Sequence, residues 1–421
     1  MGKQRRGDRR PEFQPGEWLD GTGPDSDIAV CTRARLARNV QGFPFSPRLD
    51  GAEAERLYQF VVERLSQKGL PEQLQILDLG PVDDLQREML VERHLISREL
   101  ASSRRHAGVA TDTAESVAVM INEEDHLRMQ VFASGLQPDA VWERVERLDD
   151  TVMQRLPIAW SEEFGFLTSC PTNTGTGLRL SVMLHLPGLV WSEEIDKATN
   201  VAQKIHLAVR GLYGEGSRAL GDFYQVSNQI TLGRDEQQIR GDVMLAVGRI
   251  VQWEREVRAA LLRGGARVRT LDRVHRALGT LERAQILTSE EALGCLSALR
   301  FGVQTELVDG FSIDAVNQAL LLSQPAPLQR YTRETLQPEA RDQRRAQLLR
   351  DILGCAPCRA CAAGRPARSY TAPNGRCADR APATGRSARS RRVAAVWENP
   401  ATAARALDLR PRLILYRWHP I

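Results

Sequence analysis

Two arginines that can bind an anion stand close together near the start of the chain. The segment Cys31–Asn39 reads Cys-Thr-Arg-Ala-Arg-Leu-Ala-Arg-Asn and follows the apolar run Ile28–Val30. Alternate residues of an extended segment project from the same face, so Arg33 and Arg35 should point the same way. Paired guanidinium groups favour an anionic ligand. A solvated charged strand explains this segment equally well when it is taken alone.

Three acids in succession follow a second apolar run, Val117–Ile121. They are Glu123, Glu124 and Asp125, within the segment Asn122–Arg128. A polar turn is the simpler explanation of such a cluster by itself. The strand expected in front of it favours function slightly, because site residues often lie at the ends of rigid elements.

A third segment, Cys170–Arg179, is a loop rich in glycine, threonine and asparagine that leads into an apolar run. Glycine lets the backbone approach a ligand closely, and the threonine and asparagine groups can donate hydrogen bonds to phosphate. Free cysteine is more often a small buried apolar residue than a reactive group. The polar loop around Cys170 nevertheless favours an exposed, reactive thiol.

A fourth segment, Arg210–Ser217, has three glycines within six residues and a single acid, Glu215. A tight turn explains the glycines but not the acid. The chain has neither a Walker A loop nor the His-Arg-Asp and Asp-Phe-Gly motifs of eukaryotic-type protein kinases.

Together these segments provide the groups needed for phosphoryl transfer to a guanidinium. Carboxylates at Glu124 and Glu215 and a thiol at Cys170 accompany a set of anion-binding arginines. Those arginines are Arg33, Arg35, Arg128, Arg179 and Arg210. Bidentate arginines can clamp a triphosphate with Mg²⁺, because phosphoryl transfer depends mostly on positioning and charge stabilisation. A protonated guanidinium is not a nucleophile, so carboxylates must hold it and accept a proton.

In their order along the chain, these segments resemble the signature blocks of the phosphagen (guanidino) kinase superfamily, across residues 25–235. The resemblance implies ATP and Mg²⁺ as cofactors and an α+β catalytic domain with an antiparallel sheet flanked by helices. It also implies that Glu124 is the catalytic base, that Glu215 is the second acid holding the guanidinium, and that Cys170 lies beside that guanidinium. His94 would lie near the adenine.

The nucleotide site that the resemblance implies involves residues from all these blocks. They are Thr32, Arg33, Ala34, Arg35, His94, Arg128, Arg179, Leu180, Ser181, Val182, Met183, Arg210, Gly211, Leu212, Tyr213, Gly214 and Glu215. No metal site of the protein's own is expected.

Three departures from the small-molecule kinases distinguish a branch of the superfamily. Those kinases have an N-terminal helical domain over the active site, and only residues 1–24 precede the expected catalytic domain here. Met183 stands where they usually have histidine, and Glu215 is not followed by their histidine. With an all-helical C-terminal domain, these features resemble the bacterial protein-arginine kinases (McsB type).

The segment Arg341–Ala346 resembles the motif with which that branch binds phosphoarginine as an allosteric signal. Its residues are Arg341, Asp342, Gln343, Arg344, Arg345 and Ala346. In isolation the segment would be read as the solvated face of a helix. Following a matching kinase domain, Arg341 and Asp342 are expected to meet the phosphoryl and guanidino groups of the ligand.

The residues between and after these segments predict four regions. They are a flexible lead-in (1–24), the catalytic domain (25–235), a helical dimerisation and regulatory domain (236–353), and a disordered or aberrant Arg/Ala-rich tail (354–421). Helical periodicity is strongest in the third region. The helices expected there span 238–262, 268–283, 290–299, 313–322 and 338–353. Ser289 and Ser312 are plausible N-caps.

Charge and hydropathy exclude two broad classes of function. The net charge of +4 arises from the last region, where 13 arginines face three acids, so the rest of the chain is mildly acidic and lacks a basic groove for nucleic acid. No uncharged apolar run is long enough for a membrane span, and no signal peptide is evident. A cytoplasmic protein is expected.

The expected function is therefore phosphorylation of arginine in proteins by ATP. Family resemblance further implies a role in stress response and protein quality control, through marking proteins for a Clp protease and control of a heat-shock repressor. The implied partners are protein substrates, a second copy of the chain, a zinc-binding activator and a Clp-type chaperone. A kinase for free arginine is the alternative enzyme. A catalytically silent regulator that binds phosphoarginine or nucleotide is the alternative of another class.

Overall fold

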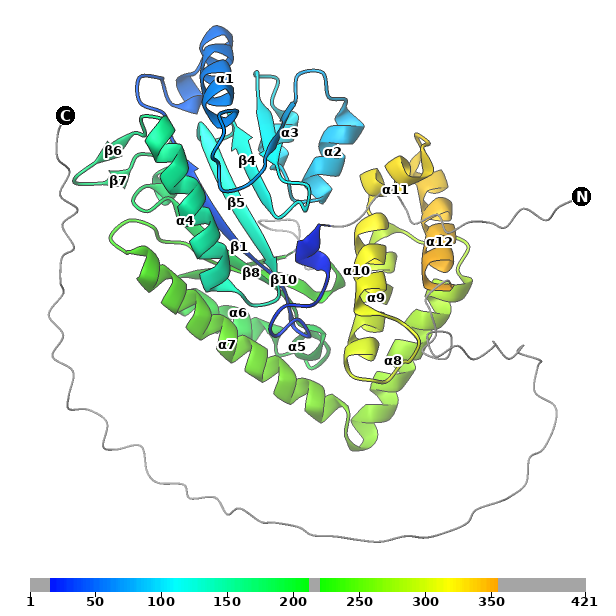
Figure 1. Ribbon diagram of the computed structural model, residues 1–421. Helices are drawn as coiled ribbons and strands as arrows, with labels where there is room; N and C mark the ends of the chain where they lie inside the picture. The colour runs from blue at the N-terminus through cyan, green and yellow to red at the C-terminus, as the bar shows by residue number, and fades with distance from the viewer. Residues whose placement is uncertain (1–15, 212–219, 355–421) are drawn as a thin grey trace, which may run out of the picture. The chain divides into compact units, whose positions relative to one another are not determined.

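The computed structural model of the protein describes residues 16–211 and 220–354, and an antiparallel sheet lies at its centre (Figure 1). Eight strands form it in the order β2-β3-β4-β5-β1-β8-β10-β9, and every pair is antiparallel. The strands are β1 Ala29–Arg38, β2 Gln75–Asp78, β3 Gly108–Thr111, β4 Val117–Ile121, β5 Leu127–Ser134, β8 Leu178–His185, β9 Leu207–Gly211 and β10 Phe223–Asn228. A separate hairpin pairs β6 Trp160–Ser161 with β7 Gly165–Phe166.

The central strand β1 divides its residues between two faces of the sheet. Ala34 and Leu36 are buried in the main apolar core, together with Val131 of β5 and Val182 of β8. Helices α1 (Gly51–Leu65), α4 (Pro138–Arg155) and α7 (Glu236–Leu261) contribute to the same core. The alternate residues of β1 project to the opposite face, which is polar around Arg33.

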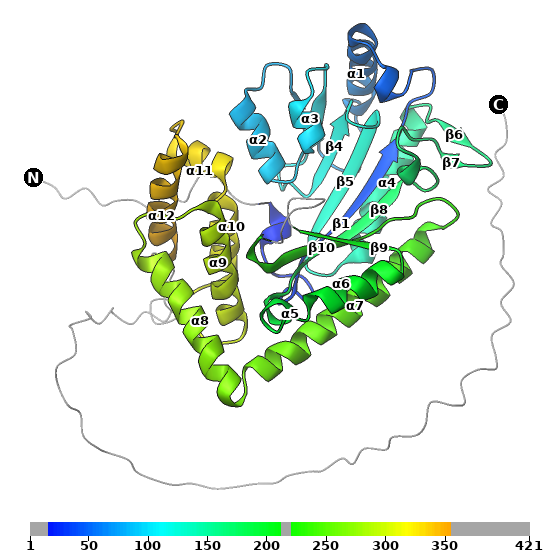
Figure 2. The ribbon, with the colours of Figure 1, turned by 180° about the vertical axis from the view of Figure 1, so that it is seen from behind.

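Local sequence explains why the helices that cover the core form. Asp50 and Glu53 make a capping box at the start of α1, and the buried residues of α4 recur at helical spacing. Shorter helices complete the region: α2 Asp84–Glu92, α3 Arg98–Ser102, α5 Pro187–Trp191 and α6 Ile195–Lys204. Figure 2 shows α6 and α7 beneath the edge formed by β8, β10 and β9.

From α7 onward the described chain is helical, as its periodicity predicted. The helices are α7 Glu236–Leu261, α8 Gly264–Arg283, α9 Ser289–Gln304, α10 Ile313–Leu322, α11 Pro325–Thr332 and α12 Pro338–Gly354. Helix α11 was not predicted; it is short and begins with proline at its first turn. The N-cap of α9 is Thr288, not Ser289, because Thr288 Oγ1 accepts from Glu291 N. Ser312 caps α10 as expected.

Two further features bear on the expected regions. Trp18 and Leu19, in the lead-in that was predicted to be flexible, are buried, and Glu17–Leu19 forms a short 3-10 helix, η1. Their apolar side chains pack with Cys31 and Phe132 of the sheet. Across the described ranges, no helix has the length and apolar character needed to cross a membrane. Gly354, the first residue of the expected tail, ends α12, and the rest of that tail, residues 355–421, lies outside the described residues.

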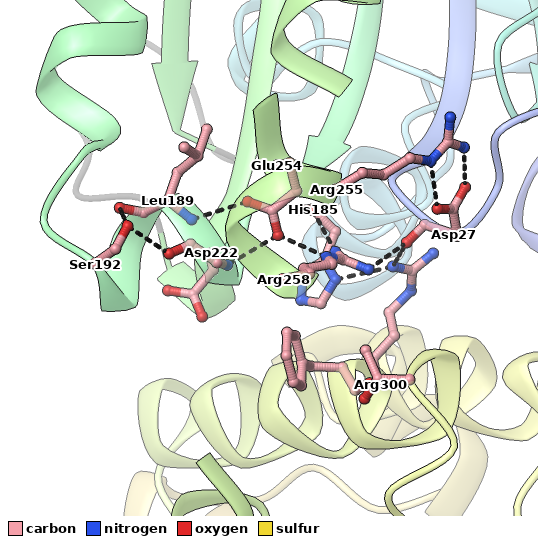
Figure 3. A network of polar contacts seen from close by, with 12 residues as sticks. Asp27, His185, Leu189, Ser192, Asp222, Glu254, Arg255, Arg258 and Arg300 are labelled. Carbon is pink, nitrogen blue, oxygen red and sulfur yellow. Dashed lines mark hydrogen bonds and ion pairs between the residues drawn. The ribbon is translucent and has the colours of Figure 1, made fainter. Parts of the chain in front are cut away.

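A buried polar network connects α9 to the sheet (Figure 3). Arg300 Nη1 lies 2.9 Å from Nδ1 of His185 at the end of β8, and Nε2 of His185 lies 2.9 Å from Ser297 Oγ. Ser297 Oγ donates to Asp222 Oδ2 at 2.8 Å. Asp222 ends η4 (Leu220–Asp222), directly before β10, so α9 is hydrogen-bonded to the ends of two neighbouring strands.

A second polar contact joins α2 to α11. The backbone N–H of Ala326 donates to Glu92 Oε2 at 2.9 Å, and Glu92 is buried. Burial raises the pKa of Glu92 to about 7, with Glu88 adding repulsion, while the Ala326 hydrogen bond, Arg98 and Arg345 act in the opposite direction.

Candidate active site

The strand register brings the predicted arginines onto one face of the sheet. Arg35 of β1 lies opposite Arg179 of β8, and Ala37 lies opposite Arg128 of β5. On the other side of β8, Met183 pairs with Gln225, which pairs in turn with Arg210 of β9. Cross-strand partners share a face. Five cations from four strands, two of them from β1, therefore line the polar side of the sheet.

Among the described residues, the hydrogen bonds of Arg33 go to uncharged groups and not to a carboxylate. Arg33 donates to Ser181 Oγ at 3.4 Å and to Gln225 Oε1 at 3.2 Å, both uncharged. Burial lowers the pKa of Arg33 to about 10, with Arg128 and Arg179 adding repulsion. Burial and the same neighbours also lower the pKa of Arg35, whose Nε has no hydrogen-bond partner among the described residues. Arg33 therefore remains cationic at neutral pH, and an anion bound here would be strongly stabilised.

The β4–β5 turn presents a carboxylate to the edge of this cluster. Arg128 Nη1 binds Glu123 Oε1 at 2.6 Å and Arg128 Nη2 binds Glu124 Oε2 at 2.8 Å. Glu123 is buried and also accepts from Ser97 Oγ, whereas the side chain of Glu124 is 41% exposed. Asn122 begins the turn in the left-handed region (φ 62°), which asparagine tolerates. Glu124 is thus an accessible acid held beside a guanidinium.

Long-range contacts bring the Cys170 loop to the same acid. Asn173 Nδ2 lies 3.5 Å from Glu124 Oε2. Asp125 Oδ1 accepts from Ser169 N at 2.6 Å and from Asn39 Nδ2 at 2.7 Å, which ties the loop to both β1 and the β4–β5 turn. Cys170 is partly exposed, and its Sγ lies 3.0 Å from Thr172 Oγ1. A thiol, an amide and a carboxylate therefore adjoin the cationic face.

A small cavity with aromatic walls adjoins Arg33 on the other side. Trp18, His94, Phe132 and Gln225 are among the residues that line it. The Trp18 ring lies 5.3 Å from that of His94 and 5.8 Å from that of Phe132, measured between centroids. Burial, with Arg33 nearby, lowers the pKa of His94 to about 3, so its imidazole is neutral. Aromatic walls next to the arginine side chains suit the heteroaromatic base of a nucleotide whose phosphates extend toward those arginines.

Three of these lining residues, Trp18, Phe132 and Gln225, were not singled out as site residues from the sequence. Gln225 lies on β10 and reaches Arg33, 192 positions away in the chain. Trp18 lay in the lead-in expected to be flexible. Its large apolar side chain, next to Leu19 in a polar segment, was the available signal that this segment is anchored.

Comparison with known proteins agrees with this geometry. Residues 56–257 match the model of the ATP:guanido phosphotransferase C-terminal catalytic domain, and residues 267–363 match the protein-arginine kinase McsB C-terminal domain. The protein-arginine kinase of Symbiobacterium thermophilum is 41% identical over 336 residues, which cover 79% of this chain and 95% of that protein. The protein-arginine kinase of Bacillus mycoides is 39% identical over 338 residues, covering 80% and 95%.

The chain belongs to the ATP:guanido phosphotransferase family, among the protein-arginine kinases. It is an ATP-dependent phosphotransferase. Among solved structures, the duplicated taurocyamine kinase of Schistosoma mansoni, with bound transition-state-analogue components, has a TM-score of 0.51 at 26% identity. That match covers 58% of this chain and 35% of the other. The α+β fold with an antiparallel sheet and a helical C-terminal region is confirmed.

Within this family fold, the expected nucleotide-site residues divide between the two faces of the sheet. Ser181 and Met183 lie on the same face as the arginines. Four others have their side chains on the opposite face or in the core: Thr32, Ala34, Leu180 and Val182. Thr32 Oγ1, for example, donates to Gly135 O at 2.7 Å. Gly211 ends β9, whereas Leu212, Tyr213, Gly214 and Glu215 lie outside the described residues.

The segment expected to bind phosphoarginine, Arg341–Ala346, lies in α12, and two of its six residues are buried. Arg345 donates to Ser323 O and to Leu287 O, each at 2.7 Å, and its Nη1 lies 2.5 Å from Asp342 Oδ1. Ala346 is in the helical core, while Arg341 and Arg344 are half-buried and Gln343 is exposed. Asp342 is therefore held by Arg345, so a guanidino ligand would compete with that side chain.

Proposed function

We propose that this protein transfers the γ-phosphate of Mg-ATP to the guanidinium of arginine residues in other proteins. The observation that carries the proposal is Glu124, which holds a guanidinium at the border of the arginine cluster. Its partner at 2.8 Å is Arg128 Nη2. Charge-assisted contacts of this type are what an acceptor arginine needs. The similarity to proteins named protein-arginine kinases supports arginine as the acceptor.

The arrangement assigns a task to each group. Arg33, Arg35, Arg128, Arg179 and Arg210 would bind the phosphates and stabilise the charge that develops on the transferred group. The cavity beside His94 would take the base. Mg²⁺ would arrive with ATP, since it is commonly bound through substrate phosphates with few protein ligands.

The acceptor side would be served by Glu124, Cys170 and Glu215. Glu124 would hold the arginine, align one nitrogen with the γ-phosphate and accept its proton. Cys170 and Asn173 would flank the same guanidinium. Glu215, as the second acid, lies outside the described residues, and its role follows from the resemblance alone.

Two other readings of the same site make different predictions. A kinase for free arginine would use the same groups with an amino acid in place of a protein. A silent regulator would bind nucleotide or phosphoarginine without turnover. The similarity to proteins named protein-arginine kinases favours a protein acceptor.

The direct test offers the purified protein Mg-ATP with either a denatured arginine-rich protein or free arginine. Acid-labile phosphate on arginine of the protein acceptor is the expected product. Phosphate on the free amino acid alone would favour the alternative kinase. ATP binding with no product from either acceptor would favour the silent regulator.

A wider role is proposed from the family. In this proposed role the protein acts in stress response and protein quality control in the cytoplasm. It marks proteins for a Clp protease and controls a heat-shock repressor. A second copy of the chain, a zinc-binding activator protein and a Clp-type chaperone are the proposed partners. Light scattering at increasing protein concentration tests the homodimer, since a constant monomer mass would contradict it.

We also propose that Arg341 and Asp342, with the rest of Arg341–Ala346, bind phosphoarginine and report it to the active site. Replacing Arg341 with alanine should abolish the response to added phosphoarginine, with each protein compared to its own rate without effector. Typical coupling between sites changes affinity by about 5- to 150-fold. Asp351→Ala, an exposed change on the same helix, is the matched control. Equal responses of both variants would remove the motif from this role.

A further inference from the structure

Exposed apolar side chains gather around the Cys170 loop. On the β6–β7 hairpin, Trp160 is 54% and Phe164 is 45% exposed. After β10, Ile230 is 39% and Leu232 is 48% exposed. We call these four residues the apolar rim. Isolated exposed apolar residues are normal on a protein surface, so the significance of the rim depends on what connects its members.

The two halves of the rim are joined through the backbone of the Cys170 loop. Phe166 N donates to Gly175 O at 2.8 Å, and Gly175 N donates to Phe166 O at 3.2 Å. On the other side, Thr231 Oγ1 donates to Thr172 O at 2.9 Å. Gly175 has a φ of 109°, and a Cβ there would lie 2.5 Å from Thr231 O, so only glycine lets the three segments meet.

A buried ion pair anchors this junction. Arg38 forms a fork with Asp149, with its Nη2 2.6 Å from Oδ2, and donates from Nη1 to Thr176 O at 3.0 Å. The Arg38 guanidinium carbon lies 3.4 Å from the centroid of the Phe166 ring. The segments that carry the rim are therefore held in place before a partner binds, which lowers the entropic cost of binding.

The charge around the rim suits a basic partner. Glu162 and Glu163 are exposed at the tip of the β6–β7 hairpin, between Trp160 and Phe164. Glu124 lies at the other border of the Cys170 loop, 3.5 Å from Asn173 Nδ2. An arginine-bearing segment with apolar neighbours would match both the acids and the exposed rings.

We propose that the apolar rim binds the residues that flank the target arginine in an extended segment of a substrate protein. The rim and the acceptor groups belong to one hydrogen-bonded assembly, so a single chain that places its arginine at Glu124 runs past the rim. An extended chain advances about 3.3 Å per residue, which puts the contacted side chains within a few positions of the arginine. This specificity role rests on the proposed function.

The test uses two labelled peptides of equal length, each with one arginine. In the first peptide the two residues on either side of the arginine are leucine and phenylalanine, and in the second they are serine. Four proteins are compared: the wild type, the rim doubles Trp160→Ser/Phe164→Ser and Ile230→Ser/Leu232→Ser, and the control double Leu245→Ser/Val268→Ser. Leu245 and Val268 are 57% and 69% exposed on α7 and α8. Kd is measured by fluorescence anisotropy, and KM and kcat by phosphate transfer. Arginine blocked at both ends serves as a small acceptor.

The wild type should bind the apolar-flanked peptide about tenfold more tightly than the serine-flanked one, a difference of about 1.4 kcal/mol. Each rim double should lose most of this preference, seen as a higher KM for the apolar-flanked peptide. The control double should keep it. The KM for ATP and the turnover of blocked arginine should stay the same in all four proteins.

The rim proposal is overturned if the wild type shows no preference, if the rim doubles retain it, or if the control double loses it equally. Peptide binding without phosphate transfer to any arginine would instead refute the proposed function, and a rim-dependent binding preference would still support the rim. Phosphate transfer to both peptides with equal affinity would refute the rim and leave the proposed function standing.

Discussion

At the scale of single residues, the contrast between Arg33 and Arg128 is informative. Arg128 is held by two carboxylates, whereas the hydrogen bonds of Arg33 go to the uncharged Ser181 and Gln225. A half-buried cation among other cations costs free energy in the unliganded protein. Binding of an anionic ligand would therefore relieve the electrostatic repulsion between Arg33 and the neighbouring arginines.

Replacing Arg33 with methionine should weaken ATP binding about 10- to 100-fold, because a hydrogen bond to a charged group contributes about 1.5 to 3 kcal/mol. The unliganded variant should be at least as stable as the wild type, since a repelled cation is removed. Isothermal titration gives the affinity, and the increase in Tm caused by ATP should shrink in parallel. Arg147→Met, an exposed change on α4, is the control. Unchanged ATP affinity in Arg33→Met would exclude Arg33 from the nucleotide site.

Glu124 can be tested by a change that keeps its shape. Glu124→Gln should leave ATP binding nearly intact and lower turnover about 100-fold or more, because glutamine cannot accept the proton of the guanidinium. Single-turnover kinetics separate the chemical step from binding. Glu143→Gln, an exposed acid on α4, should behave as the wild type. Near-normal turnover of Glu124→Gln would remove Glu124 from the base role.

At the scale of elements, the contact of α2 with α11 makes the free energy of unfolding depend on pH. Glu92 is buried where Ala326 N meets it, and burial raises its pKa to about 7 from an ordinary value near 4.5. An acid with a raised pKa binds more protons in the folded than in the unfolded state between these two values. Its ionisation therefore lowers the free energy of unfolding as pH rises from about 4.5 to about 7.

Glu92→Gln should remove this dependence while keeping an acceptor for Ala326. At pH 8 the variant should be more stable than the wild type, by at most about 3 kcal/mol for a pKa shift of this size. At pH 5 the advantage should shrink, because Glu92 is then protonated in the folded protein. Thermal denaturation at both pH values checks this. A stability difference that is the same at pH 5 and pH 8 would contradict the raised pKa.

At the scale of the whole described molecule, the polar network around Arg300 and His185 links the C-terminal helices to the sheet (Figure 3). Arginine can only donate, so His185 Nδ1 must accept from Arg300 and Nε2 must carry the proton that goes to Ser297. The Ser297 hydroxyl proton is then directed to Asp222. Burial, with Arg300 and Arg258 nearby, lowers the pKa of His185, which keeps it neutral.

Arg300→Met should uncouple the unfolding of the C-terminal helices from the unfolding of the sheet. Beyond His185, Arg300 donates to the backbone oxygens of Ser26 and Asp27. The Asp27 oxygen keeps a hydrogen bond from Arg258, whereas a buried acceptor left unpaired costs about 1 to 3 kcal/mol. Calorimetry should show one cooperative transition for the wild type and a broadened or split transition for the variant. Arg276→Met, at an exposed ion pair on α8, is the control. A single unshifted transition in Arg300→Met would show that the network does not join the two parts.

Much of the site and fold was accessible from local pattern. Alternation in an extended strand predicted that Arg33 and Arg35 share a face, and helical periodicity predicted α10 with its Ser312 cap. These features depend on residues within a few positions of each other, so their periods are visible in the sequence. The resemblance to the guanidino kinases added the order of the blocks and the family.

Other features were decided by tertiary structure alone. The register that sets Arg35 opposite Arg179, the approach of Asn173 to Glu124, and the bond between His185 and Ser297 join residues that are 144, 49 and 112 positions apart. No local period encodes such pairings, because they depend on how strands align and which faces meet. The burial of Trp18 has the same cause, since a polar lead-in is anchored only when the sheet offers its apolar side chain a place to pack.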